Sequence, residues 1–207
     1  MISTPERSPE RDAAIEAMLP MVPISGWSMR TLIDTAGPDA DLLFPGGAAD
    51  MVETYVDWAD RRMEAAAAAE DLSGLRVPAR IRRVMALRFE QSRYDKEAVS
   101  RGLGVLSLPQ NAGIGLRTAA RTVDAIWHAA GDRSADFSWY TKRATLLPIY
   151  GATLLFWLRD QSADDQESLA FLDRRLAGVG RIGQMRGRVA RAIERVRPKM
   201  RQEADAA

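Results

Sequence analysis

The chain has 207 residues, of which 46% are hydrophobic and 28% are charged, as in an ordinary folded protein. A net charge of +1 excludes a general attraction to polyanions, and the lack of cysteine excludes disulfides, thiolate nucleophiles and thiolate metal sites. The first ten residues contain no apolar signal segment, and no uncharged apolar run reaches the roughly 18 residues that cross a bilayer. We therefore expect a cytoplasmic protein, associated at most peripherally with the inner face of the cytoplasmic membrane.

Helical periodicity runs along almost the whole chain, and the alternation typical of strands is not found in the sequence. This pattern predicts an all-α fold of about ten helices. Pro78 suits a first helical turn, and Gly131 suits a helix C-terminus. Ser134 and Ser162 are suited to begin helices, and Pro148 should kink the helix that contains it. The expected helices cover residues 9–19, 28–35, 38–43, 47–72, 79–89, 95–106, 109–130, 134–159 and 162–176.

The first part of the chain resembles the three-helix head of tetracycline-repressor-type (TetR) regulators. The resemblance covers residues 13–58 and rests on an amphipathic first helix, the segment Gly26-Trp-Ser-Met-Arg-Thr-Leu-Ile-Asp-Thr-Ala-Gly37 and a short third helix that ends at Phe44. Five acidic residues and no lysine or arginine lie between Ile33 and Glu53. Because such a surface repels a phosphate backbone, we expect a helix-turn-helix-like head that does not bind specific nucleic acid.

A second resemblance covers nearly the whole chain. Its segments are Leu108-Pro-Gln-Asn111, Asp124-Ala-Ile-Trp-His128, Ala130-Gly-Asp-Arg-Ser-Ala-Asp-Phe-Ser-Trp-Tyr-Thr-Lys-Arg-Ala144, Asp160-Gln-Ser162 and Phe171-Leu-Asp-Arg-Arg175, together with Gly26-Trp-Ser28 and Phe44-Pro-Gly-Gly47. With these segments the chain resembles the coenzyme Q (ubiquinone) biosynthesis accessory proteins. Pro148 departs from the pattern expected of that family.

The resemblance implies a TetR-like bundle without catalysis or cofactor. It also implies a pocket for an isoprenoid quinone intermediate or phospholipid, a homodimer, and partnership with the demethoxyubiquinone hydroxylase. The expected organisation is a head over residues 1–58, a lipid- and partner-binding domain over 59–177, and a membrane-contact segment over 178–207. The expected lipid-binding residues lie in the apolar part of the helix around Pro148: Leu146, Ile149, Tyr150, Leu154 and Phe156.

A patch around Trp139 is the partner surface that the resemblance implies. Asp136 and Tyr140 share one helical face, as do Trp139 and Arg143. Size alone favours an inward Trp139, but the resemblance favours an exposed anchor of the kind that protein interfaces use. We expect Ile126 to complete this patch by pointing outward, and Trp127 to point inward.

Four polar residues at intervals of four suggest a metal site, but the sequence argues against one. Asp124, His128, Asp132 and Asp136 would form a stripe only on an unbroken helix, and Gly131 interrupts it. His128 is the only histidine of the chain, so no cluster of histidine ligands can form. We therefore expect a capped turn, with the aspartates on backbone donors and His128 bonded locally.

The C-terminal segment combines a narrow apolar stripe with many cations. Between Gly178 and Arg201, eight cationic residues stand against Glu194 alone, a net charge of +7 that leaves −6 for the rest of the chain. An amphipathic helix of this kind suits an anionic membrane surface, although core packing, a dimer seam or a solvated tail are alternatives. The expected membrane-contact residues are Ile182, Met185, Val189, Ile193, Arg186 and Arg191.

The sequence thus predicts a lipid-binding accessory protein that is not an enzyme. The alternatives are a TetR-class transcriptional regulator that senses a hydrophobic effector, and a metal-dependent enzyme that uses Asp124, His128 and Asp132.

Overall fold

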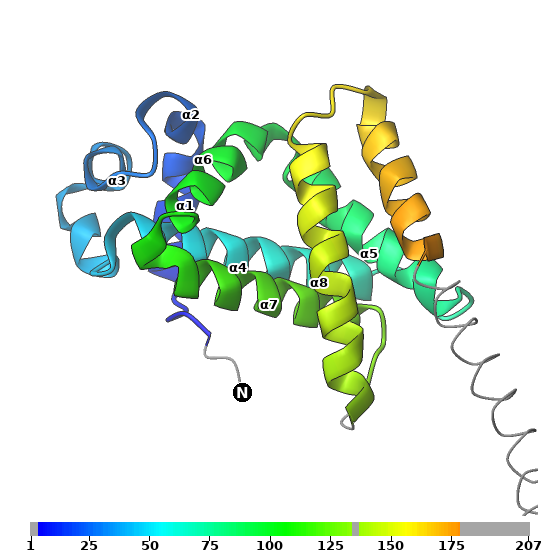
Figure 1. Ribbon diagram of the computed structural model, residues 1–207. Helices are drawn as coiled ribbons and strands as arrows, with labels where there is room; N and C mark the ends of the chain where they lie inside the picture. Colours follow the sequence, from blue (N-terminus) through cyan, green and yellow to red (C-terminus); the bar gives the residue numbers. More distant parts are fainter. Residues whose placement is uncertain (1–3, 134–136, 179–207) are drawn as a thin grey trace, which may run out of the picture.

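The computed structural model describes residues 4–133 and 137–178, and over these ranges every regular element is helical. Nine α-helices are present in this part of the chain, as the all-α prediction required (Figure 1). Eight of them are α1 (Pro9–Met18), α2 (Val22–Ser25), α3 (Met29–Ala36), α4 (Gly47–Ala68), α5 (Val77–Gln91), α6 (Lys96–Leu106), α7 (Ala112–Ala129) and α8 (Phe137–Trp157). A ninth helix covers residues 166–178 and is called the final helix below.

Local sequence signals set most helix ends. Ser8 and Ser28 cap α1 and α3 by accepting hydrogen bonds from the backbone N–H groups of Arg11 and Thr31. Gly131 adopts a φ of 85° directly after α7, which confirms the predicted helix end there. The helix expected over 38–43 is a 3-10 helix, and the long fourth helix stops at Ala68 rather than at residue 72. Pro148 lies inside α8, which continues through it.

Two hydrophobic cores are joined by α4. The head core packs α1, α3 and the first half of α4 around Ile15, Leu32 and Tyr55, and α6 adds Ala98 and Leu106 to it. The second core packs the other half of α4 against α5, α7, α8 and the final helix (Figure 1). Residue 58, the expected end of the head, lies in the middle of α4. A single 22-residue helix therefore carries side chains for both cores.

A buried ion pair ties the helices of the second core together. The Nε of Arg88 on α5 donates to Oδ1 of Asp60 on α4 at 3.1 Å, and the side chains are 7% and 9% exposed. Thr122 on α7 donates its hydroxyl to Oδ2 of Asp60 at 2.7 Å. Both oxygens of this buried carboxylate are therefore satisfied by two other helices, as a buried charge requires.

Polar contacts also attach the final helix to the bundle. Asp160 accepts hydrogen bonds from the backbone and hydroxyl of Ser168 and from the backbone of Ser162. Despite the opposing effect of burial, these bonds lower the pKa of Asp160 to about 2. Lys96 on α6 pairs with Asp165 at 2.8 Å, just before the final helix. These contacts tie the final helix to the end of α8 and to α6.

Ile126 was predicted to point outward, and this prediction is wrong. Its side chain is completely buried in the second core, whereas Trp127 is buried at 9% exposure as expected. The side chains of Ile126 and Trp127 are both buried because α4 covers α7 on one side and α8 covers it on another. Consecutive residues of a helix enclosed in this way can both be buried.

The pKa of Asp60 predicts a pH dependence of stability. Burial outweighs the attraction of Arg88 and raises this pKa from 3.8 to about 6. Between these values the folded state keeps a proton that the unfolded state has released, so stability falls as pH rises through this window. The Asp60→Asn variant lacks this titration. The stability of the unsubstituted protein relative to the variant should therefore fall by about 2 kcal/mol between pH 4 and pH 7 in urea unfolding. If the free energy of unfolding of the two proteins changes with pH in parallel, the pH dependence does not come from Asp60.

The position of Ile126 gives a second prediction. Ile126→Ala should lower the free energy of unfolding by about 2–5 kcal/mol, because it removes buried methyl groups and leaves a cavity. Leu116→Ala is the matched control on the same helix, since Leu116 is 64% exposed and should cost about 0.5 kcal/mol or less. Equal losses for the two variants would place Ile126 at the surface after all.

Candidate functional site

An aromatic patch lies at the start of α8 and consists of Trp139, Tyr140 and Arg143. The two rings meet edge to face with centroids 4.8 Å apart, and Tyr140 is 67% exposed while Trp139 is half-buried. The guanidinium carbon of Arg143 lies 4.1 Å from the centre of the Trp139 ring. Asp136, which was predicted to join this patch, lies outside the described residues. The structure thus brings three of the five predicted partner residues together and buries Ile126 elsewhere.

Two carboxylates hold the patch in place, Asp124 on α7 and Asp132 in the turn after it. Asp124 accepts from Nε of Arg143 at 2.5 Å, and Asp132 accepts from Nη1 of the same residue at 3.2 Å. Lys142 pairs with Asp132 at 2.6 Å. Asp132 thus binds side chains rather than only the backbone donors expected of it. Asp124 and Asp132, which the sequence suggested as possible metal ligands, instead orient the guanidinium of Arg143 over the Trp139 ring.

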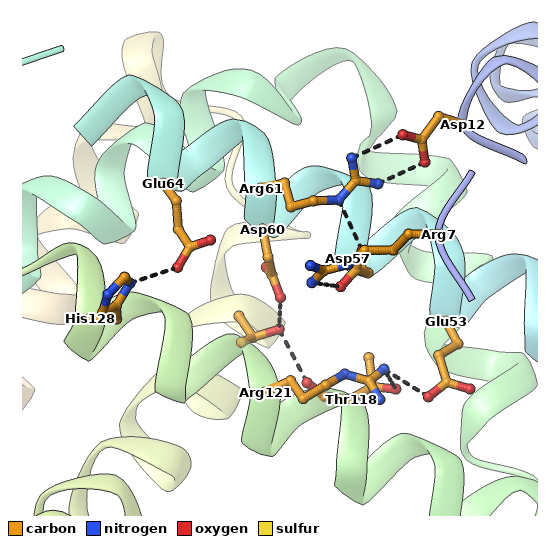
Figure 2. A network of polar contacts seen from close by, with 11 residues as sticks. Arg7, Asp12, Glu53, Asp57, Asp60, Arg61, Glu64, Thr118, Arg121 and His128 are labelled. Carbon is orange, nitrogen blue, oxygen red and sulfur yellow. Dashed lines mark hydrogen bonds and ion pairs between the residues drawn. The ribbon is translucent and has the colours of Figure 1, made fainter. Parts of the chain in front are cut away.

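His128 was expected to bond locally, but its partner is distant in the sequence. Its Nδ1 lies 3.2 Å from Oε1 of Glu64 on α4, and the imidazole is 77% exposed (Figure 2). Among the described residues there is no group of three or more possible metal ligands. The interaction joins the outer faces of α4 and α7 without building a ligand cluster.

A polar basin of about 580 Å³ opens beside the aromatic patch. Trp139 and Tyr140 line it from α8, Asp60 and Glu64 from α4, and His128 from α7. Figure 2 shows the ion pairs along its walls, which join Arg7 to Asp57, Arg61 to Asp12 and Asp57, and Arg121 to Glu53. Because these charges are paired with one another, the basin is polar but close to electrically balanced.

The five predicted lipid-binding residues line three different surfaces. Leu146 and Ile149 line an apolar groove of about 270 Å³, while Tyr150 and Leu154 line a smaller central cavity of about 70 Å³. Phe156 lines neither of them. Its ring stacks on Phe171 of the final helix with centroids 4.7 Å apart, and both rings line a third hollow. The five candidates for lipid contact therefore do not share one space, because successive turns of α8 face different neighbours.

The groove is built from segments far apart in the sequence. Its lining includes Trp127 of α7, Ile81 of α5 and Leu176 of the final helix. Val77 and Pro78 belong to the groove and were not predicted to be functional. Val77 is 47% exposed. An exposed valine next to a proline at a helix start was the only sequence signal for this contribution.

The expected membrane-contact residues, Ile182, Met185, Val189, Ile193, Arg186 and Arg191, lie outside the described residues. Across residues 4–133 and 137–178, no helix is both long enough and apolar enough to span a bilayer.

The head exposes acidic groups where a DNA-reading helix would need cations. Asp39 and Asp41 are exposed on the 3-10 helix that follows α3. Arg30 of α3 is 92% exposed but lies 3.8 Å from Asp34. The structure therefore retains the acidic character that the sequence showed between Ile33 and Glu53.

Comparisons with known proteins give related sequences and a related fold. Residues 112–183 match the family model described as COQ9. The mitochondrial ubiquinone biosynthesis protein COQ9 of Rattus norvegicus is 43% identical over 83 residues, which cover 40% of this chain and 27% of that protein. COQ9-A of Xenopus laevis is 43% identical over 94 residues, 45% of this chain and 30% of that protein. The Schizosaccharomyces pombe coq9 protein is 27% identical over 148 residues, 71% of this chain and 58% of that protein.

The chain thus matches less than a third of the length of its vertebrate relatives. Among solved structures, a TetR transcriptional regulator from Nitrosomonas europaea superposes with a TM-score of 0.66 at 21% identity, covering 82% of this chain and 97% of that one. At this identity the likeness concerns the fold alone. From the family match over residues 112–183, these relatives and this neighbour, the chain is similar to the COQ9 ubiquinone biosynthesis proteins and has a TetR-like fold.

Proposed function

We propose that this protein is a lipid-binding accessory protein of ubiquinone biosynthesis. It holds an isoprenoid quinone intermediate and presents it to the demethoxyubiquinone hydroxylase at the membrane, without a catalytic step of its own. The names of its relatives place those proteins in ubiquinone biosynthesis. The proposal extends that role to this chain, which acts as a homodimer.

The apolar groove carries the proposal. A pocket lined by Leu146, Ile149, Ile81 and Leu176 offers a continuous hydrocarbon surface to an isoprenoid tail. Its volume of about 270 Å³ lies near the lower end of the range of small-molecule sites, roughly 300–1,000 Å³. The groove therefore takes part of a long tail, and the rest of the lipid extends beyond it.

The aromatic patch is the proposed contact with the hydroxylase. A half-buried tryptophan covered by an arginine combines two residue types that dominate the energy of protein interfaces. Asp124 and Asp132 fix Arg143 before any partner arrives, which reduces the entropy lost on binding.

Membrane contact is assigned to the C-terminal segment on the basis of its sequence. Its net charge of +7 favours an anionic surface by about 1 kcal/mol for each cation near the lipid headgroups. The final helix is described up to residue 178, and its Leu176 lines the groove. A membrane-bound segment that starts here leaves the groove near the lipid from which a ligand would enter.

A TetR-class transcriptional regulator is the alternative that the fold permits. The exposed acidic residues of the 3-10 helix after α3 oppose it, because base edges and phosphates are read mainly by cationic and amide side chains. We therefore favour the accessory role.

Blocking the groove should remove the bound lipid. Thr145 lines the groove from α8, so Thr145→Trp should fill it with an indole ring. Protein purified from cells that make ubiquinone should then carry at least about tenfold less isoprenoid lipid, measured by mass spectrometry of organic extracts.

Ala144→Trp is the matched control, because Ala144 is exposed and lies outside the groove. It should retain the lipid content of the unsubstituted protein, and both variants should keep their melting temperatures. Equal lipid in two folded variants would show that the lipid, if present, is held elsewhere.

Trp139→Ala should weaken capture of the purified hydroxylase by about 2 kcal/mol or more, roughly thirtyfold in Kd. Its free energy of unfolding should change by much less than the roughly 3–5 kcal/mol of a core aromatic, since Trp139 is only half-buried. Cells with this variant as sole copy should accumulate demethoxyubiquinone at normal protein levels.

Tyr94→Ala serves as the control, because Tyr94 is 95% exposed and remote from the patch in sequence and fold. It should leave hydroxylase capture unchanged. Unaltered capture by Trp139→Ala, or a collapsed melting temperature, would remove Trp139 from the interface.

A further inference from the structure

The turn that joins α8 to the final helix contains two residues in a strained backbone conformation (Figure 1). Asp164 has a φ of 53° and a ψ of 30°, and Asp165 has a φ of 55°. Among the residues that the structure describes, these two neighbours are the non-glycine residues with positive φ. Residues other than glycine adopt this left-handed conformation at a cost in free energy, although aspartate tolerates it better than most. The turn therefore needs contacts from elsewhere to keep its shape.

Two cations from the segment between α5 and α6 supply these contacts. Arg93 donates from Nη1 to Asp164 at 2.8 Å and from Nε to Asp165 at 3.1 Å. Lys96, the first residue of α6, donates from Nζ to Oδ1 of Asp165 at 2.8 Å. The side chain of Asp165 is only 4% exposed. Loss of either cation would therefore leave a buried carboxylate short of positive charge, which is costly.

Lys96 also contacts the end of α8. Its Nζ donates to the backbone carbonyl of Asp160 at 2.8 Å and lies 4.9 Å from the centre of the Trp157 ring. Trp157 is the last residue of α8, and Asp165 directly precedes the final helix. One ammonium group therefore joins the end of one helix to the start of the next.

The final helix has little buried apolar surface to hold it in place. Between residues 166 and 178, Leu172 is the fully buried apolar side chain, whereas Phe171 and Leu176 are partly exposed. Asp173 pairs with Arg82 at 2.7 Å, but both side chains are at least 40% exposed, and such surface pairs contribute little. Segments with few buried apolar contacts open at a lower free energy than the core of a protein.

We propose that the turn at Asp164 and Asp165 is a strained latch, and that the final helix opens from the bundle as one unit when the ion pairs to Arg93 and Lys96 break. The ion pairs favour the closed position, and relief of the left-handed conformation favours the open one. Because Leu176 lines the groove, opening uncovers the groove. The use of this opening to admit a lipid rests on the function proposed above, whereas the opening itself does not.

Hydrogen–deuterium exchange of the full chain, read by mass spectrometry, measures the opening without reference to a ligand. Amides of residues 166–178 should be less protected than those of α7, because the final helix opens without global unfolding. Lys96→Met keeps the length of the side chain but removes its charge, and it should raise the exchange of the final helix relative to α7 about tenfold. Arg101→Met is the matched control on α6. Because Arg101 pairs with Glu97 of the same helix, its loss should leave that ratio unchanged.

A second pair of variants tests the strain. Asp164→Gly relieves the left-handed conformation, and the ion pair that it removes is weak because the carboxylate of Asp164 is 77% exposed. Exchange of the final helix should therefore slow about threefold. Ala163→Gly places glycine at the preceding residue, whose φ is not positive, so the substitution should not slow exchange.

The proposal is overturned if residues 166–178 are as protected as α7 in the unsubstituted protein, if Lys96→Met and Arg101→Met give the same ratio, or if Asp164→Gly fails to slow exchange. A general loss of stability in Lys96→Met would raise exchange in both helices alike, and an unchanged ratio counts against the latch. Asp164→Gly tests the strain even where Lys96→Met fails to fold. The lipid content of Thr145→Trp is a separate measurement, so failure of the groove as a lipid site is distinguishable from failure of the latch.

Discussion

The buried pair of Asp60 and Arg88 constrains the rest of this structure. Taking both charges out of water costs several kcal/mol for each ion, and only close mutual contact and further hydrogen bonds offset that cost. Thr122 and Ser92 supply those bonds, so α4, α5 and α7 must keep one relative position. Asp60 also lines the polar basin, while Arg88 and Thr122 line the central cavity. Two spaces of different chemistry are thereby separated by a single ion pair.

The three candidate surfaces are connected through α8. Its first turns carry Trp139 and Arg143, its middle carries Leu146 and Ile149, and Tyr150 reaches the central cavity. Lys142 lines the groove and pairs with Asp132, the same carboxylate that accepts from Arg143 above Trp139. The edge of the proposed lipid site and the proposed partner surface therefore share one carboxylate, which suits a protein that passes a lipid to a partner.

The helices and the similarity to COQ9 proteins were accessible from the sequence because their signals are local. Serine caps, positive-φ glycines and a 3.6-residue apolar period act within a few residues of one another, so they predict helix ends without knowledge of the fold. Gly131 is an example, since its position alone predicted the break after α7 and so argued against the metal stripe. The block around Trp139 was recognised in the same way, and the structure confirms that Trp139, Tyr140 and Arg143 lie together.

The sequence by itself therefore determined an all-helical chain, most helix ends and the residues of the aromatic patch. Only the tertiary structure decided that Ile126 is buried, that Phe156 stacks on Phe171, and that the groove takes Val77 and Leu176 from distant helices. Periodicity gives the angle of a residue around its own helix, but the neighbour at that angle depends on how the helices pack. The partners of Arg88, His128 and Asp132 were hidden for the same reason: each pair joins different elements, and hydrogen bonds between distant segments leave no periodic trace in the sequence.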